Sequence, residues 1–228
     1  MGVEVRAVAM LLSFCSVFAG LTNDLFADIS PDALLVLVNR EHKIAYDYIP
    51  QGLVLPQVLA APGKETAIYL RADPAYELEK MLSAAMEDGH TLYAVSGYRS
   101  YALQKTIYTR KVEKAGEYQR TVAPPGASEH QLGLAIDVNG ESTVASGLVA
   151  KFGETPEGEW VYANAHRFGF IIRYPKDKTD ITGYAWEPWH LRYVGKEAAE
   201  EIFALDITFE EYHAILRQRL VEAWIQQP

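Results

Sequence analysis

The sequence contains a single cysteine, Cys15, among its 228 residues. One cysteine cannot form an intramolecular disulfide, so the fold must be stable without covalent cross-links. A zinc site of the multi-cysteine type is excluded for the same reason, because such sites need two or more thiolates. Any metal ion must therefore be held by histidine, aspartate or glutamate, and the six histidines make such a site feasible.

Positive charge is also scarce. The 21 lysines and arginines are outnumbered by 30 aspartates and glutamates, which gives a formal net charge of −9. A negative field of this size repels nucleic acid, so no nucleic-acid partner is expected. Peptides and sugars remain as ligand classes. The hydrophobic content of 49% suffices for a normal core, and the length is that of about one domain.

An uncharged apolar run occupies residues 7–20. It is shorter than the roughly 20 residues that a membrane-spanning helix needs, but it has the length of a signal-peptide core. Arg6 precedes it, and Ala19 suits the last position before a cleavage site. We therefore predict that residues 1–20 are a signal peptide or an uncleaved N-terminal membrane anchor, so that the protein works outside the cytoplasm. The alternative is a buried N-terminal helix.

The remainder of the chain alternates helical and strand patterns. Residues 21–65, interrupted by Pro50, Pro56 and Pro62, predict an irregular N-terminal arm. Residues 66–228 predict the main domain, with a helical C-terminal extension from about residue 196. The pattern is typical of an α+β fold with a small, mainly antiparallel sheet flanked by helices. Strands are expected near residues 91–95, 133–138, 170–174 and 189–194.

Local signals predict several details of these elements. Asp73 is expected to cap a helix that buries an apolar stripe including Tyr76 and Met86. Ser100 is expected to cap a second helix, in which Leu103 faces inward. Residues 133–138 alternate apolar and other side chains, which predicts a half-buried strand.

Three short segments combine residue types that carry chemistry. Residues 128–137 read Ser-Glu-His-Gln-Leu-Gly-Leu-Ala-Ile-Asp, and residues 187–190 read Glu-Pro-Trp-His. The third segment, residues 96–100, reads Ser-Gly-Tyr-Arg-Ser, and Gln104 follows it by about one helical turn. Each of these residues has an ordinary structural explanation by itself, so the prediction rests on their combination.

The histidines and the aspartate of these segments fit a metal site. A catalytic zinc ion takes three protein ligands and keeps one position open, and two imidazoles with one carboxylate are sufficient. Asp137 lies in an otherwise apolar strand, where a bare carboxylate would be costly to bury. Its partner is either a metal ion or an arginine. His130 precedes this strand, and His190 belongs to another strand of the expected sheet.

Two further residues suit catalysis by such a site. Glu187 lies three residues before His190, and Pro188 between them makes a regular strand impossible there. A bend at Pro188 would bring the Glu187 carboxylate beside a metal ion without making it a ligand, as a general base requires. Arg99 lies on a turn after a strand and could stabilise an oxyanion or bind a substrate carboxylate.

Together these segments resemble the motifs of the VanY-type D-alanyl-D-alanine carboxypeptidases, zinc peptidases that share a fold with the Hedgehog signalling domain. That family has a Ser-x-His-x-x-Gly-x-Ala-x-Asp segment and a Glu-x-x-His segment, and both are present here without a gap. The resemblance extends over residues 35–195 or so. Also family-like are the turn at residues 96–100 with Gln104 and the lead-in at residues 37–40 and 48–50.

The resemblance implies a role for each motif residue. His130, Asp137 and His190 correspond to the ligands of one zinc ion. Glu187 corresponds to the catalytic base, and Arg99 to the arginine that stabilises the tetrahedral intermediate. The residues that correspond to those holding the terminal D-alanine are Gln104, Ser128 and Tyr184.

The function implied by the resemblance is removal of the C-terminal D-alanine from peptidoglycan stem peptides, outside the cytoplasmic membrane. An L,D-carboxypeptidase, a dipeptidase or an endopeptidase with the same site is the nearest alternative, because pocket shape decides which bond is cleaved. A non-catalytic zinc-binding or peptidoglycan-binding module would not need Glu187 and Arg99. A two-histidine, one-carboxylate iron oxygenase usually has its first histidine and carboxylate closer together than His130 and Asp137 are.

Overall fold

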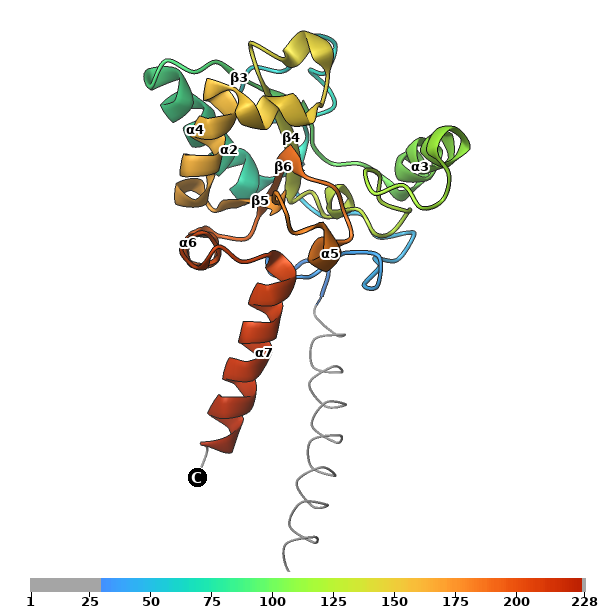
Figure 1. The fold of residues 1–228 in the computed structure, drawn as a ribbon, viewed down its shortest axis with the longest axis vertical. Helices are drawn as coiled ribbons and strands as arrows, with labels where there is room; N and C mark the ends of the chain where they lie inside the picture. Colours follow the sequence, from blue (N-terminus) through green and yellow to red (C-terminus); the bar gives the residue numbers. More distant parts are fainter. Residues whose placement is uncertain (1–29, 227–228) are drawn as a thin grey trace, which may run out of the picture.

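The computed structural model describes residues 30–226, which Figure 1 shows as coloured ribbon. The segment predicted to be a signal peptide or anchor, residues 1–20, lies outside the described residues and stays a prediction. Among the helices of residues 30–226, none combines the length and the hydrophobicity that a bilayer span requires.

A four-stranded antiparallel sheet forms the centre of the domain. Its strands lie in the order β3, β4, β6, β5, so that β4 and β6 are neighbours in the middle. The predicted α+β fold with an antiparallel sheet is thus confirmed. The bounds are Leu92–Ser96 for β3, Ala135–Gly140 for β4, Phe170–Tyr174 for β5 and Glu187–Tyr193 for β6.

Helices cover one side of this sheet, and a separate lobe lies on the other side (Figure 1). The covering helices are α2 (Ala72–Glu87), α4 (Pro156–Asn164) and α6 (Lys196–Leu205), while α3 (Tyr101–Ala115) forms the lobe and α7 (Phe209–Ile225) projects from the domain. The short elements are β1 (Leu53–Val54), β2 (Leu70–Arg71), α5 (Thr179–Thr182) and four 3₁₀ turns: η1 (Glu129–Leu132), η2 (Val144–Ser146), η3 (Ala150–Glu154) and η4 (Ala165–Phe168).

The core lies between α2 and the sheet. Leu78, Met81 and Leu82 of α2 are buried, as the sequence predicts. Tyr76 and Met86 were expected in the same stripe but are 59% and 55% exposed, because they lie on the flanks of the helix. The helix also starts earlier than predicted, so Arg71 is the N-cap.

Strand β4 is more deeply buried than its alternating sequence suggests. All six of its residues are buried, so the prediction of a half-buried strand was wrong. The cause is its central position between β3 and β6: one face meets the core, and Asp137 on the other face lines a cleft. Polar side chains on β4 are therefore not solvated and need partners within the protein.

The α3 lobe is joined to the domain mainly through its first turns. Ser100 caps the helix as predicted, since its Oγ accepts a hydrogen bond from the Leu103 amide. The prediction that Leu103 faces inward was wrong: it is 52% exposed, and Gln104 is the buried residue of this helix. The helix stands away from the core, and it presents Gln104 to the cleft beside the sheet.

The described part of the predicted N-terminal arm, residues 30–65, contacts the domain at several points. Its Leu53–Val54 segment pairs with β2, and Ala60 forms a parallel bridge to Ala94 of β3. Nearer its start, the carbonyl groups of Leu34 and Val36 accept hydrogen bonds from the buried Arg192. These contacts make residues 34–60 part of the packed structure.

Gly97, directly after β3, allows a close approach between two backbone segments. A Cβ at this position would lie 2.3 Å from the carbonyl oxygen of Tyr69. We expect Gly97→Ala to lower the free energy of unfolding by about 3 kcal/mol, at the upper end of the cost of overpacking. Gly89→Ala is the control, because Gly89 has open space around it and only a positive φ of 87°.

The control should lose about 1 kcal/mol, the usual cost of a left-handed alanine. Urea denaturation of both variants measures the difference. An equal loss in the two variants would contradict the steric account of Gly97.

Candidate metal centre and cleft

Strand pairing brings two of the predicted ligands together. Asp137 of β4 and His190 of β6 are direct partners in the antiparallel register, so both side chains point to the same face of the sheet. His130 comes from the 3₁₀ turn η1 just before β4. Gly133 ends that turn in a left-handed conformation, with φ 68°, and the chain then enters β4.

The three side chains form a compact, buried group. One nitrogen of each histidine and one oxygen of Asp137 all lie within 4.8 Å of one another. His130 Nε2 is 3.4 Å from Asp137 Oδ2, and His190 Nδ1 is 3.0 Å from Asp137 Oδ1. Nitrogen and carboxylate donors in this number and proximity fit a zinc ion, as the sequence predicts.

The pKa shifts of the three side chains also fit the binding of a cation. Burial and the nearby Arg99 lower the pKa of His130, which favours the neutral imidazole that binds metals. Burial alone would raise the pKa of Asp137, but the two histidines hold it well below its usual range. Burial also disfavours charge on His190, yet its acidic neighbours Asp137 and Glu129 raise its pKa to about 9. The surrounding carboxylates thus favour positive charge at this point.

Glu187 lies beside this group and is not part of it. Its carboxylate is buried, and Oε1 has no hydrogen-bond partner in the structure. Burial raises its pKa to about 8, with Asp137 adding to the effect. The register of β5 and β6 is irregular next to Pro188, as the proline predicts, since Tyr174 pairs with Glu187 although Ile172 pairs with Leu191. This irregularity turns Glu187 into the cleft, where it lines the wall with His190.

Arg99 reaches the group from the turn after β3. Its guanidinium donates hydrogen bonds to Gln104 Oε1 at 2.9 Å and to Ser96 Oγ at 3.0 Å. One nitrogen also lies 3.5 Å from Asp137 Oδ2. Gln104 is fixed in turn by a hydrogen bond to the carbonyl of Ala123. Arg99 is therefore held in place with its charge directed into the cleft.

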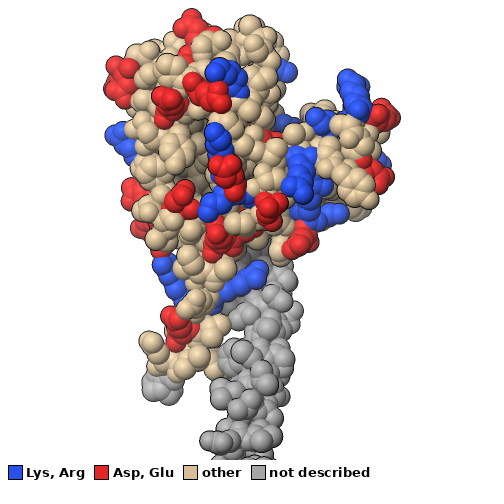
Figure 2. Space-filling view, viewed as in Figure 1, with Lys and Arg blue, Asp and Glu red and all other residues tan. Residues whose placement is uncertain are grey.

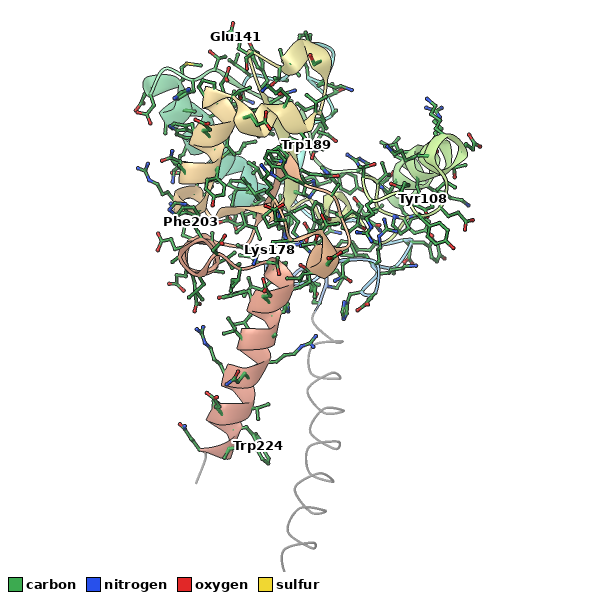
Figure 3. All side chains as sticks on the ribbon, in the orientation of Figure 1. Tyr108, Glu141, Lys178, Trp189, Phe203 and Trp224 are labelled. Atoms are coloured by element: carbon green, nitrogen blue, oxygen red, sulfur yellow. The ribbon has the colours of Figure 1, made fainter. Side chains whose placement is uncertain are left out.

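One cleft beside the sheet is lined by all the residues predicted for the site. Ser128 and Tyr184 lie on its walls, both nearly fully buried. Trp189 of β6 also lines it (Figure 3). The structure thus brings together all eight predicted site residues, while their individual roles stay predictions.

The cleft includes residues that the sequence did not reveal. Tyr174 stacks on His190 with the ring centroids 5.1 Å apart, and Lys111 of α3 also lines the cleft. Lysines and arginines gather on this lobe (Figure 2), where α3 carries Lys105, Arg110, Lys111 and Lys114. In the sequence, the spacing of Gln104, Ile107 and Lys111 puts them on one face of a helix, and this was the signal that could have indicated Lys111.

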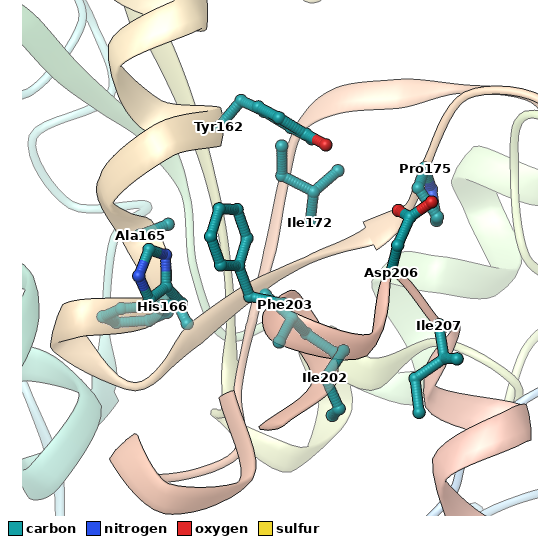
Figure 4. Close-up of a pocket in the computed structure, with 11 residues that line it drawn as sticks. Tyr162, Ala165, His166, Ile172, Pro175, Ile202, Phe203, Asp206 and Ile207 are labelled. Atoms are coloured by element: carbon teal, nitrogen blue, oxygen red, sulfur yellow. The ribbon is translucent and has the colours of Figure 1, made fainter. Parts of the chain in front are cut away.

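A second hollow has a different character. It is lined mainly by apolar side chains of α4, β5 and α6, and His166 stacks on Phe203 at its edge (Figure 4). His166 and Asp206 are its metal-ligating side chains, and among the described residues no third ligand joins them. The chemistry of the described residues therefore lies in the cleft beside the sheet.

Comparison with known proteins agrees with this site. The sequence profile of the VanY family, described as D-alanyl-D-alanine carboxypeptidase, matches residues 67–196. The Bacillus subtilis (strain 168) protein YodJ is 47% identical over 186 residues, which cover 80% of this chain and 68% of YodJ. The matched family region contains every residue of the predicted site.

Two solved structures extend the comparison. The LdcB LD-carboxypeptidase has 46% sequence identity and a TM-score of 0.75, over 80% of this chain and 86% of that chain. A zinc complex of a variant of the vancomycin-resistance D,D-pentapeptidase VanY has 37% identity and a TM-score of 0.63, over 78% and 98% of the two chains.

The metal centre generates a direct prediction. His130→Ala removes one of three ligands from a buried site, so we expect the purified protein to lose bound zinc. His42→Ala is the control, because His42 is exposed and does not line the cleft. Elemental analysis by mass spectrometry should find about one zinc per chain in the wild type and the control, and far less in His130→Ala. Equal zinc in all three proteins would refute the site.

Proposed function

The chain belongs to the VanY family of D-alanyl-D-alanine carboxypeptidases, and we propose that it is a zinc-dependent enzyme that removes the C-terminal D-alanine from peptidoglycan stem peptides. The observation that carries this proposal is the buried group of His130, Asp137 and His190 next to an unpaired Glu187 carboxylate. A purely structural metal site would not need that carboxylate.

A bound metal ion would supply Lewis acidity, which would make water more acidic and polarise a carbonyl group. His130, Asp137 and His190 would hold it. Zinc is the ion found with the related VanY structure, and the two-nitrogen, one-oxygen donor set here suits it. The net charge of such a site stays positive, because Asp137 contributes its one negative charge.

Glu187 performs the proton transfers. Its carboxylate accepts a proton from the attacking water and then gives this proton to the amine of the departing D-alanine. A buried carboxylate with no other hydrogen-bond partner, beside the three ligands, is suited to both steps. Its place on the irregular part of β6 keeps it beside the ligands without joining them.

Arg99 stabilises negative charge on the reacting carbonyl. Its hydrogen bonds to Gln104 and Ser96 fix the guanidinium before substrate binds, so that little reorganisation is needed in the transition state. Gln104, Ser128 and Tyr184 lie on the cleft walls and would bind the terminal D-alanine with its carboxylate. Recognition of a free carboxylate makes the enzyme an exopeptidase.

The second candidate function is cleavage of a different peptide bond by the same site. The likeness to the LdcB LD-carboxypeptidase, at 46% identity, favours cleavage of the L,D bond of a tetrapeptide. The catalytic residues would be unchanged, and the cleft wall would select the penultimate residue.

We also propose that the protein acts outside the cytoplasmic membrane, where stem peptides are located. The uncharged run at residues 7–20 supports export, as a signal peptide or as a tether. Sequencing the N-terminus of the protein recovered from the cell envelope separates a cleaved signal from an anchor.

Glu187→Gln tests the proposed base. The change keeps the size of the side chain and leaves the three ligands in place, so zinc content should be unchanged. Turnover should fall by about 10²–10⁴-fold, the usual contribution of a general base. Glu141→Gln, at an exposed turn, is the matched control and should keep wild-type turnover. Full activity of Glu187→Gln would show that another group moves the proton.

The bond preference is tested with two substrates. Purified protein is incubated with muramyl pentapeptide or muramyl tetrapeptide, with and without a chelator, and the products are followed by mass spectrometry. We expect loss of one alanine from the pentapeptide, abolished by the chelator. Loss from the tetrapeptide alone would establish the L,D type, and cleavage of neither by zinc-loaded protein would overturn the carboxypeptidase proposal.

A further inference from the structure

Two further buried polar atoms beside the metal centre, like Glu187 Oε1, have no hydrogen-bond partner in the structure. They are Nε2 of His190 and Oε2 of Glu129. The two atoms face each other at 3.6 Å, just beyond hydrogen-bonding distance. The Glu129 side chain is fully buried and that of His190 nearly so. Bulk water therefore has little access to either atom, and a partner within the protein is expected.

Glu129 is held rigidly by its other oxygen. Oε1 accepts hydrogen bonds from Arg173 Nε and Arg192 Nη1, each at 2.8 Å, and both arginine side chains are fully buried. The remaining donors of the two arginines are used elsewhere: Arg173 binds Glu210 of α7, and Arg192 binds backbone carbonyls of the arm. These contacts hold the Glu129 side chain in place, with Oε2 directed toward His190.

The orientation of His190 assigns different tasks to its two nitrogens. Nδ1 faces Asp137 at 3.0 Å, so Nδ1 is the nitrogen that can share a metal ion with that carboxylate. A neutral imidazole that ligates through Nδ1 carries its proton on Nε2, the atom that faces Glu129. His130 shows the corresponding arrangement, because its Nδ1–H donates to the Gly97 carbonyl and its Nε2 faces Asp137.

We propose that Glu129 is the positioning residue of the metal centre: its Oε2 accepts the Nε2–H of His190 and so fixes the tautomer and the ring orientation that present Nδ1 to the metal. The proposal rests on the proposed function, since it requires that the site holds zinc. Metal-bound histidines commonly donate their second N–H to such a carboxylate, and the contact strengthens metal binding.

A purely structural role would not explain the second oxygen. Two buried arginines need two negative charges, and Glu129 with Glu210 supplies them. Glu210 does this with both of its oxygens on Arg173. Glu129 uses one oxygen for both arginines and directs the other into the metal centre. The two glutamates therefore form a matched pair for an experiment.

The test compares Glu129→Gln with Glu210→Gln in zinc titrations against a competing chelator. Both variants remove one carboxylate from the same charge cluster, so both lose stability, as thermal unfolding will show. We expect the zinc Kd to rise about 10–100-fold in Glu129→Gln and to stay within about twofold of wild type in Glu210→Gln. In the cobalt-substituted protein, the visible absorption spectrum should change in Glu129→Gln alone.

An equal Kd in the two variants and the wild type would overturn the positioning role. A parallel rise of the Kd in both variants would also overturn it, because the effect would then belong to the cluster as a whole. Intact zinc binding with no peptide hydrolysis would contradict the proposed function and leave this inference standing, so the two failures are distinguishable.

A second measurement needs no variant, in case Glu129→Gln does not fold. With ring-¹⁵N-labelled histidine, NMR of the zinc-loaded protein reports which nitrogen of His190 carries the proton. We expect a protonated Nε2 that exchanges slowly with solvent, together with a metal-bound Nδ1. A metal-bound Nε2, or a proton on Nδ1, would overturn the proposal.

Discussion

The burial of Asp137 is the constraint on which the site depends. A carboxylate on a central strand, 3% exposed, is tolerated only where positive charge or several donors surround it. The antiparallel register supplies His190 from β6, the η1 turn supplies His130, and the turn after β3 supplies Arg99. Each of these elements occupies its place because the sheet order sets β4 between β3 and β6. The order of the strands therefore places both the cation site and Arg99 around Asp137.

A second group of charged side chains lies next to the group around Asp137. Glu129, Arg173, Arg192 and the half-buried Glu210 pair with one another, and they connect η1, β5, β6 and α7. Removing one member would leave an uncompensated buried charge, which makes the cluster sensitive to substitution. The arm also contributes through its carbonyl groups to Arg192. The terminal segments thus support the metal centre, although α7 projects away from the domain in Figure 1.

Much of this arrangement could be predicted from the sequence. Alternation along β4 and β6 identified the strands, and the motif spacing placed His130, Asp137, His190 and Glu187 in one site, which the structure brings together. Glu129 was not predicted, because its partners Arg173 and Arg192 come from strands far along the chain and no local pattern links them. The exposure of Leu103 was also missed, since a helical stripe does not reveal that α3 stands away from the core.

The central claim is that His130, Asp137 and His190 hold one zinc ion while Glu187 stays unbound beside it. Anomalous diffraction at the zinc edge, from crystals of the protein grown with zinc, tests this claim most directly. The account predicts one strong peak about 2.0–2.2 Å from one atom of each of the three ligands, with the Glu187 carboxylate in the cleft and outside this distance. A peak elsewhere, or one that includes Glu187 as a ligand, would contradict it.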